Sequence, residues 1–135
     1  MNLRRVFLDA NVLVAIGLRP RGSYRRFLDV EDHRYVTSEH ILAEVEENLT
    51  AMNIHCSEFL TNLRKIMEVT DRVSKLPVGL PLYDDEDRQA LAEAIGAECD
   101  EFVTFNSNDF NAIYNQRIEG VLIRHSADFK RQFFP

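Results

Sequence analysis

The chain has 135 residues, which is enough for one compact domain and too short for two. Hydrophobic residues make up 45% of the sequence and charged residues 28%, a balance that excludes a disordered chain. The net charge of −6 argues against non-specific nucleic-acid binding over the whole surface. The longest apolar run, Val12 to Leu18, is far shorter than the roughly 20 residues of a membrane-spanning helix, so we expect no membrane partner.

The cysteine content and the N-terminus both bear on the cellular compartment. Cys56 and Cys99 are too few for a disulfide scaffold or a zinc site of their own, which favours a reducing compartment. Two arginines precede an apolar run, as in a secretory signal. However, Asp9 and Asn11 interrupt that run, and no small-residue cleavage site follows it. We therefore predict a buried strand here and a cytoplasmic protein.

Strand-like and helical patterns alternate along the chain, which is typical of an α/β fold with a central parallel sheet. In chain order we expect a strand at residues 5–8, helical character from about 11, a short helix from Ser23 to Val30, a strand at 35–36, a helix from the cap at 37–38 to about 49, a helix capped by Ser57, a strand at 73–76, a helix over 85–97, a strand at 101–104, a short helix over 109–114, a strand at 120–123, and a closing helix or tail over 128–134. The two consecutive helices after residue 37 should form an arm beside the sheet of a single domain, residues 1–135.

The helix predicted over residues 85–97 carries an unusual acid. Asp87 falls in the middle of its apolar face, between the positions of Ala90, Leu91 and Ala94. A carboxylate that points toward a core is costly unless it is paired, hydrogen-bonded or metal-bound. Asp87 therefore indicates a functional site, with an ordinary helix cap as the competing interpretation.

A second acid, Asp9, directly follows the apolar run of the first strand. Ligand sites of open parallel sheets lie beyond the carboxyl ends of the strands, and this strand is expected to be central. Asn11 is placed to hold Asp9 by a hydrogen bond. An ordinary cap of the following helix explains Asp9 equally well.

Two further segments offer acids near the same edge of the sheet. Residues 103–110 place polar and acidic groups beyond another strand, although a capped polar loop has the same composition. On the helix that begins near residue 38, Glu44 and Glu46 flank the apolar face on opposite sides, so periodicity does not choose between them.

Several acids from separate segments would thus converge at one place, where they cannot all ionise comfortably without a cation. Ligation by oxygen alone suits Mg²⁺ or Mn²⁺ and not zinc. Such ions support the hydrolysis of phosphodiesters, and they reverse the local negative potential that would repel a polyanionic substrate.

Other chemistries lack their sequence signatures. The chain contains no phosphate-binding GxxxxGK[ST] loop, no GxGxxG, no HExxH and no GxSxG. We interpret the four scattered histidines as surface or structural residues. The first 26 residues carry six arginines against one acid, which indicates either a local basic patch or a solvated surface.

Four short motifs in order resemble those of PIN-domain ribonucleases, and most closely the toxins of toxin–antitoxin systems. They are residues 7–13 (FLDANVL), 38–45 (SEHILAEV), 85–95 (DEDRQALAEAI) and 103–110 (VTFNSNDF). The resemblance covers nearly the whole chain. It implies a Rossmann-like α/β/α sandwich and RNA cleavage that depends on Mg²⁺ or Mn²⁺.

The resemblance also assigns roles to residues. Asp9 matches the first catalytic, metal-binding acid, Glu44 the second and Asp87 the third, with Asp85 as an alternative for the third. Where the family often has a fourth acid, this chain has Asn106, and we expect Asp109 to replace it. Thr104 matches a polar position that supports the acidic centre.

Partners are inferred from the resemblance alone. It implies an RNA substrate, a small antitoxin protein and a homodimer. For the phosphates of RNA we expect contacts from arginines near the N-terminus: Arg19, Arg21, Arg25 and Arg26. For a protein partner we consider Phe129, Phe133 and Phe134, which have packing on the domain itself as their other interpretation.

Two alternatives to a nuclease stay open. Asn106 at the fourth acidic position is compatible with a catalytically inactive PIN fold that binds RNA or protein. A phosphoryl-transfer domain is the second alternative. Haloacid-dehalogenase-type phosphatases usually have an acid where this chain has Asn11, and a phosphoreceiver domain needs a late lysine, for which only Lys130 is present.

Overall fold

The computed structural model describes residues 3–19, 28–29 and 31–133. Its centre is a mostly parallel six-stranded sheet with the order β3-β2-β1-β4-β6-β5, in which only the pairing of β5 with β6 is antiparallel. The strands are β1 (Arg4–Leu8), β2 (His33–Ser38), β3 (Glu68–Thr70), β4 (Glu101–Thr104), β5 (Arg117–Ile118) and β6 (Val121–His125).

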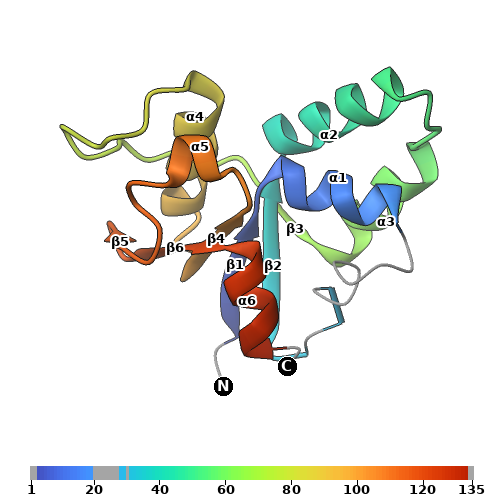
Figure 1. The fold of residues 1–135 in the computed structure, drawn as a ribbon. Coiled ribbons are helices and arrows are strands. Elements are labelled where there is room, and N and C mark those ends of the chain that lie inside the picture. The colour runs from blue at the N-terminus through green and yellow to red at the C-terminus, as the bar shows by residue number, and fades with distance from the viewer. Residues whose placement is uncertain (1–2, 20–27, 30, 134–135) are drawn as a thin grey trace.

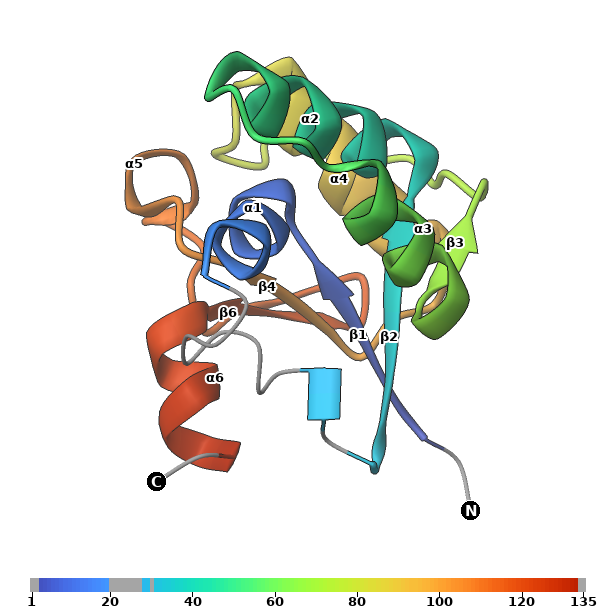
Figure 2. The same ribbon diagram turned by 90° about the vertical axis from the view of Figure 1, so that its right-hand side faces the viewer.

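Helices cover both faces of the sheet, as Figures 1 and 2 show. The helices are α1 (Ala10–Leu18), α2 (Glu39–Ala51), α3 (Ser57–Ile66), α4 (Asp85–Gly96), α5 (Ser107–Phe110) and α6 (Ser126–Phe133). Strand order reverses after β3, so the right-handed crossovers place α1, α2 and α3 on one face and α4 and α5 on the other. Helix α6 follows the last strand and packs on β6 and β4. This is the expected Rossmann-like α/β/α sandwich.

The alternation of side chains along the strands builds a core on each face. Phe7 of β1 and Phe102 of β4 lie in register and stack with ring centroids 5.6 Å apart, and Phe110 of α5 stacks on Phe102 at 5.2 Å. The neighbouring residues Val6 and Leu8 point to the opposite face and are also fully buried. Because residues 6–8 of β1 are buried on both faces, this part of the strand reads as a continuous apolar run.

The two consecutive helices expected after residue 37 are α2 and α3. Helix α2 packs along α1. Gly17 of α1 allows α3 to approach closely, since a Cβ on Gly17 would lie 2.8 Å from a ring carbon of Phe59. The pair therefore extends the helical layer on the α1 face, as Figure 2 shows.

Two expected positions differ from the structure. The strand predicted at residues 73–76 is wrong, because the sheet ends with β3 and this segment packs on α4 instead. The N–H of Ser74 donates to the carbonyl of Ala92, and a Cβ on Gly96 would lie 2.8 Å from the backbone of Val73. The expected cap of α3 is also wrong: the N-cap is Cys56, and Ser57 is the first helical residue.

Other differences are local. The short helix predicted over 109–114 begins earlier, as α5, because the Asn106 side chain accepts a hydrogen bond from the Asp109 N–H. Strand β5 was not predicted, and it is only two residues long. Phe129 is fully buried, and Phe133 packs on it and on His33, so these rings belong to the domain. The cap at Ser23, the helix start that it implies and Phe134 lie outside the described residues. None of the described helices combines the length and apolar character that crossing a membrane requires.

Candidate active site

A pocket of about 430 Å³ lies beyond the carboxyl ends of the central strands β1 and β4, between α1, α2, α4 and α5. Figure 1 shows these helices together at the upper end of the sheet. Its described lining contains no lysine or arginine. It contains six carboxylates: Asp9, Glu44, Asp84, Glu86, Asp87 and Asp109. The pocket is therefore strongly acidic, as the sequence predicted for this edge of the sheet.

Asp9 lies at the bottom of this pocket, where β1 ends and α1 begins. Its side chain is buried; Oδ1 accepts a hydrogen bond from the N–H of Ala10 at 2.8 Å, and Oδ2 accepts one from Oγ1 of Thr104 at 2.9 Å. Burial raises the pKa of Asp9, although these two hydrogen bonds act in the opposite direction. Asp9 thus caps α1, and it also lines the pocket.

Thr104 connects Asp9 to the polar segment after β4. Its hydroxyl receives hydrogen bonds from the Asn11 amide at 2.9 Å and from the N–H of Asn106 at 3.2 Å, and donates its own hydrogen to Asp9. Thr104 itself is fully buried. Asn11 therefore holds Asp9 through Thr104 and not directly.

Asp87 lies in the first turn of α4, and its Oδ2 is buried with no hydrogen-bond partner among the described residues. Asp84 is the N-cap of α4 and accepts hydrogen bonds from the N–H groups of Glu86 and Asp87, so the helix cap is not Asp87. Burial, and then contact with the Asp109 carboxylate and the charge of Asp9, raise the pKa of Asp87 to about 8.

Asp109 approaches Asp87 from α5. Ligand atoms of Asp84, Asp87 and Asp109 all lie within 4.8 Å of one another. Asp109 is exposed, and its contacts with Asp87 and with the Asn106 amide lower its pKa. Asn106 Nδ2 donates to Asp109 Oδ2 at 2.8 Å, so Asn106 positions Asp109.

Glu44 lines the pocket from α2, while Glu46 on the same helix is exposed. Burial, and then the hydrogen bond and the charge of Glu86, raise the pKa of Glu44 to about 8. Ligand atoms of His40, Glu44 and Glu86 lie within 4.8 Å of one another. The structure thus places Glu44 in the pocket, where the helical pattern alone left the choice open.

The donor set of the pocket fits a hard divalent cation. The unpartnered Oδ2 of Asp87 is the orphaned ligand atom that such an ion would satisfy. Burial first, and then the neighbouring acids, raise the pKa values of Glu44 and Asp87 to about 8, as expected where buried acids lack a counter-ion. Carboxylate oxygens are the ligands of Mg²⁺ and Mn²⁺.

Three pocket or neighbouring residues were missed from the sequence: Asp84, Glu86 and His40. The first two lie beside Asp87 and are exposed, as Asp85 is, and which of these acids line the pocket depends on where α2 and α5 pack. Asp85, the alternative third acid, is exposed and does not line the pocket. Each residue of a helix is rotated by about 100° from the one before it, so the side chains of Asp85 and Asp87 point in nearly opposite directions.

The pocket also has an apolar end, between α1 and α2. Leu18 is 42% exposed and Met52 is 50% exposed, and both line it together with Val14. The N-terminal arginines were expected to contact RNA. Arg19, the C-cap of α1, is exposed beside Leu18, whereas Arg21, Arg25 and Arg26 lie outside the described residues.

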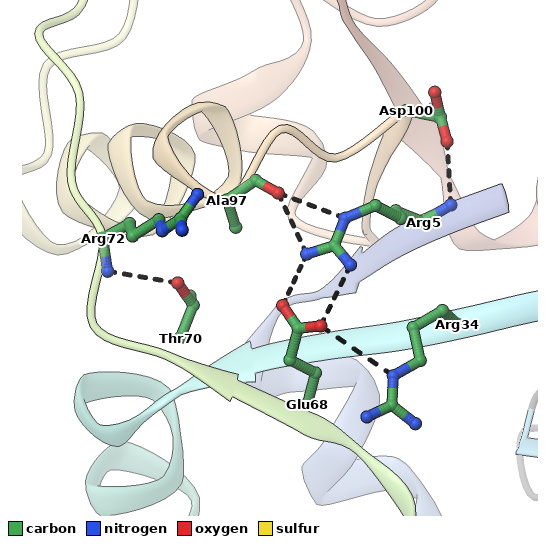
Figure 3. A network of polar contacts seen from close by, with 7 residues as sticks. All are labelled: Arg5, Arg34, Glu68, Thr70, Arg72, Ala97 and Asp100. Atoms are coloured by element: carbon green, nitrogen blue, oxygen red, sulfur yellow. Dashed lines mark hydrogen bonds and ion pairs between the residues drawn. The ribbon is translucent and has the colours of Figure 1, made fainter. Parts of the chain in front are cut away.

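Arg4 and Arg5 do not contribute to a basic patch at the pocket, because they lie at the opposite end of the sheet. Arg5 donates to both carboxylate oxygens of Glu68 and to the carbonyl of Ala97, as Figure 3 shows. Arg4 pairs with Glu101 at 2.7 Å. Both arginines are committed to ion pairs within the fold.

The fold and the acidic pocket define a PIN-type domain, and comparison with known proteins agrees. The sequence model of the PIN domain matches residues 5–108, so the chain belongs to the PIN domain family. No curated protein matches the chain.

Two solved structures share the fold. One is the VapBC2 structure from Rickettsia felis, bound to a DNA fragment from its promoter: the matched chain is 18% identical, with a TM-score of 0.64, over 90% of this chain and 98% of that chain. The other is VapC20 of Mycobacterium tuberculosis, described as a toxin that cleaves the sarcin-ricin loop. It is 18% identical, with a TM-score of 0.61, over 79% of this chain and 94% of that chain.

Proposed function

We propose that residues 1–135 form one metal-dependent endoribonuclease domain that hydrolyses phosphodiester bonds in RNA. The observation that carries this proposal is the buried Oδ2 of Asp87, which has no hydrogen-bond partner among the described residues and belongs to a pocket lined by five more carboxylates. An uncompensated buried carboxylate destabilises a fold, so its presence on the pocket wall favours a role in binding a cation.

Asp9, Glu44, Asp87 and Asp109 are the residues that would hold Mg²⁺ or Mn²⁺. When bound, such an ion supplies the activation of water and the stabilisation of charge that phosphodiester hydrolysis requires. Thr104 and Asn11 keep Asp9 oriented, and Asn106 keeps Asp109 oriented. Orientation of ligand side chains by such hydrogen bonds is typical of metal sites.

The proposal of RNA as substrate rests on family membership and on VapC20, whose description names cleavage of the sarcin-ricin loop. The described lining of the pocket offers no lysine or arginine to the phosphates. A bound cation would therefore supply the positive charge at the reacting phosphate. Arg19, beside the apolar end of the pocket, would supply it further out, and Arg21, Arg25 and Arg26 are the other arginines that we propose for phosphate contacts.

We also propose that the chain is the toxin of a toxin–antitoxin pair, with a small antitoxin as its protein partner and a second copy of the chain in a homodimer. The matched chain of the VapBC2 structure, which has this fold, and VapC20, which is described as a toxin, support the first part. The exposed side chains of Leu18 and Met52 offer apolar contact area next to the acids. Light scattering of the purified chain, alone and with the co-expressed partner, tests both assemblies.

The decisive experiment compares two aspartates of the same helix turn. We expect Asp87→Asn to lower Mn²⁺-dependent cleavage of single-stranded RNA by at least about 100-fold, because one metal ligand is lost. Asp85→Asn is the matched control: it removes the same charge from an exposed position outside the pocket and should leave cleavage within about twofold.

A second variant, Asp9→Asn, should likewise abolish cleavage. If wild-type protein binds RNA without cleaving it in Mg²⁺ or Mn²⁺, the nuclease proposal is wrong and the inactive binding module is correct. If Asp9→Asn or Asp87→Asn cleaves as the wild type does, the assignment of these residues is wrong.

A further inference from the structure

A second group of polar side chains lies directly behind Glu44. Glu93 of α4 is only 4% exposed, although it carries a carboxylate. Its Oε1 accepts a hydrogen bond from Oγ of Ser38 at 2.9 Å and lies 3.2 Å from Nδ1 of His40. A buried carboxylate is tolerated only when it is paired and hydrogen-bonded. These two contacts, from the last residue of β2 and the first turn of α2, provide that pairing.

His40 lies between two carboxylates. One ring nitrogen, Nδ1, contacts Glu93, and the other, Nε2, lies 4.0 Å from Oε1 of Glu44. Because a carboxylate only accepts hydrogen bonds, the contact with Glu93 requires a hydrogen on Nδ1. That contact fixes the orientation of the ring and directs Nε2 toward Glu44.

Glu44 has particular need of such a neighbour. It has several rotatable bonds. Burial raises its pKa, and then so do the contact with Glu86 and the charges of Glu86, Asp9 and Asp87 on the pocket side. Without an opposing contact, repulsion favours rotamers that turn the carboxylate away from the other acids and into solvent. His40 precedes Glu44 by one helical turn on the same face of α2, so it contacts Glu44 from behind.

We propose that His40 is a positioning residue for Glu44, and that the buried Glu93 and the Ser38 hydroxyl hold His40 in place. The inference rests on the proposed function, which assigns Glu44 as a metal ligand. It adds three residues, His40, Glu93 and Ser38, which do not line the pocket and whose effect reaches the site through the Glu44 carboxylate.

The test measures Mn²⁺ binding by calorimetry and cleavage of a mixed-sequence single-stranded RNA. We expect His40→Ala to weaken Mn²⁺ affinity roughly 10–100-fold, the usual effect of removing a group that orients a metal ligand. The same variant should lower kcat and leave KM for RNA unchanged. Glu93→Gln should also weaken Mn²⁺ binding. The double variant should bind Mn²⁺ no more weakly than His40→Ala does, because the two residues act in series.

A conservative variant separates positioning from packing. His40→Gln places an amide near the position of Nε2, so it should restore part of the lost Mn²⁺ affinity. The matched control for Glu93 is Glu101→Gln. Glu101 is equally buried and ion-paired, but it lies at the amino end of β4, away from the pocket. We expect it to lower the melting temperature and leave Mn²⁺ affinity unchanged.

Three results would overturn the inference. If His40 acts only as a competing positive charge, its removal tightens Mn²⁺ binding. If it is only structural, His40→Ala lowers the melting temperature at unchanged Mn²⁺ affinity. If Glu101→Gln weakens Mn²⁺ binding as much as Glu93→Gln, the effect is one of general stability. Should Glu93→Gln not fold, His40→Ala decides alone, because the His40 side chain is 22% exposed and its loss disturbs less of the core.

Asp87→Asn distinguishes failure of the inference from failure of the proposed function. If Asp87→Asn loses Mn²⁺ binding and His40→Ala does not, the metal site stands and only the role of His40 is wrong. If Asp87→Asn binds Mn²⁺ as tightly as the wild type, the proposed function itself is wrong.

Discussion

The two ends of the sheet differ in whether their acids are paired with arginines. At the amino end of β4, Glu101 is fully buried between Arg4, at 2.7 Å, and Arg124, at 3.0 Å. At the carboxyl ends, the pocket that contains Asp9 and Asp87 has no lysine or arginine in its described lining. The carboxylate is therefore neutralised by arginines at one end, and at the other end the described lining offers the acids no lysine or arginine. Burial of an acid indicates a function only where its countercharge is missing.

The first prediction concerns loss of the buried Glu101 carboxylate at the amino end of β4. Glu101→Gln should lower the free energy of unfolding by about 3 kcal/mol, because it leaves the guanidinium of Arg124, whose side chain is 13% exposed, without its buried carboxylate, and the more exposed Arg4 without its partner. Urea denaturation followed by circular dichroism measures this loss. Mn²⁺ should stabilise the variant and the wild type equally, so the difference between them should persist, since this end of the sheet does not contact the pocket. A variant as stable as the wild type would show that the pairing contributes nothing net.

The second prediction concerns the acidic end. Mn²⁺ at about a hundred times its dissociation constant should raise the free energy of unfolding by about 2.7 kcal/mol, because the ion binds the folded chain and not the unfolded one. Thermal melts with and without EDTA measure the effect. Asp87→Asn should remove most of it, and Asp85→Asn should retain it. An equal effect of Mn²⁺ on Asp87→Asn would place the binding site elsewhere.

The sequence predicted those site residues whose pattern lies within one helix or one strand, and not those whose position depends on distant elements. Asp87 was found because a single helix contains both the acid and the apolar face on which it lies. Asp9 was found because parallel strands place their carboxyl ends together. Glu44 and Glu46 flank the same apolar face of α2. Which of them lines the pocket depends on the positions of α1 and α4, and the apolar pattern of α2 does not give those positions.

The roles of the residues that were missed come from contacts between distant parts of the chain. His40 and Glu93 are 53 positions apart, and neither residue stands out in its local sequence. Glu93 lies well away from the stripe that contains Asp87 and is buried because α4 is covered on more than one side. The strand at 68–70 was missed for a similar reason: Glu68 looks like a surface residue until Arg5 is seen beside it (Figure 3).

The third prediction uses pH to separate the two ends. The pKa values of Glu44 and Asp87 are raised to about 8 in the folded chain, so between pH 5 and 8 the folded state keeps protons that the unfolded chain has lost. Stability without metal should therefore fall as pH rises through this range. Because both groups are only partly buried, we expect a total loss of about 1–2 kcal/mol.

Thermal melts in EDTA at pH 5.5, 7 and 8.5 measure this loss. In saturating Mn²⁺ the trend should reverse, because metal binding requires the deprotonated carboxylates. Asp87→Asn in EDTA should melt above the wild type at pH 8.5 and close to it at pH 5.5. A wild-type melting temperature that is flat across the range would contradict the crowding of acids at the pocket.

The smallest expected effect comes from the second ion pair at the amino ends of the strands. Arg5 and Glu68 form a two-pronged contact, with Nη1 3.0 Å from Oε1, and the pair lowers the pKa of Glu68 (Figure 3). Their side chains are 29% and 35% exposed, so water screens the interaction. Glu68→Gln should therefore cost less than about 1 kcal/mol, against about 3 kcal/mol for Glu101→Gln. Urea denaturation of the two variants side by side measures the difference. Equal losses would mean that depth of burial is not what separates these two pairs.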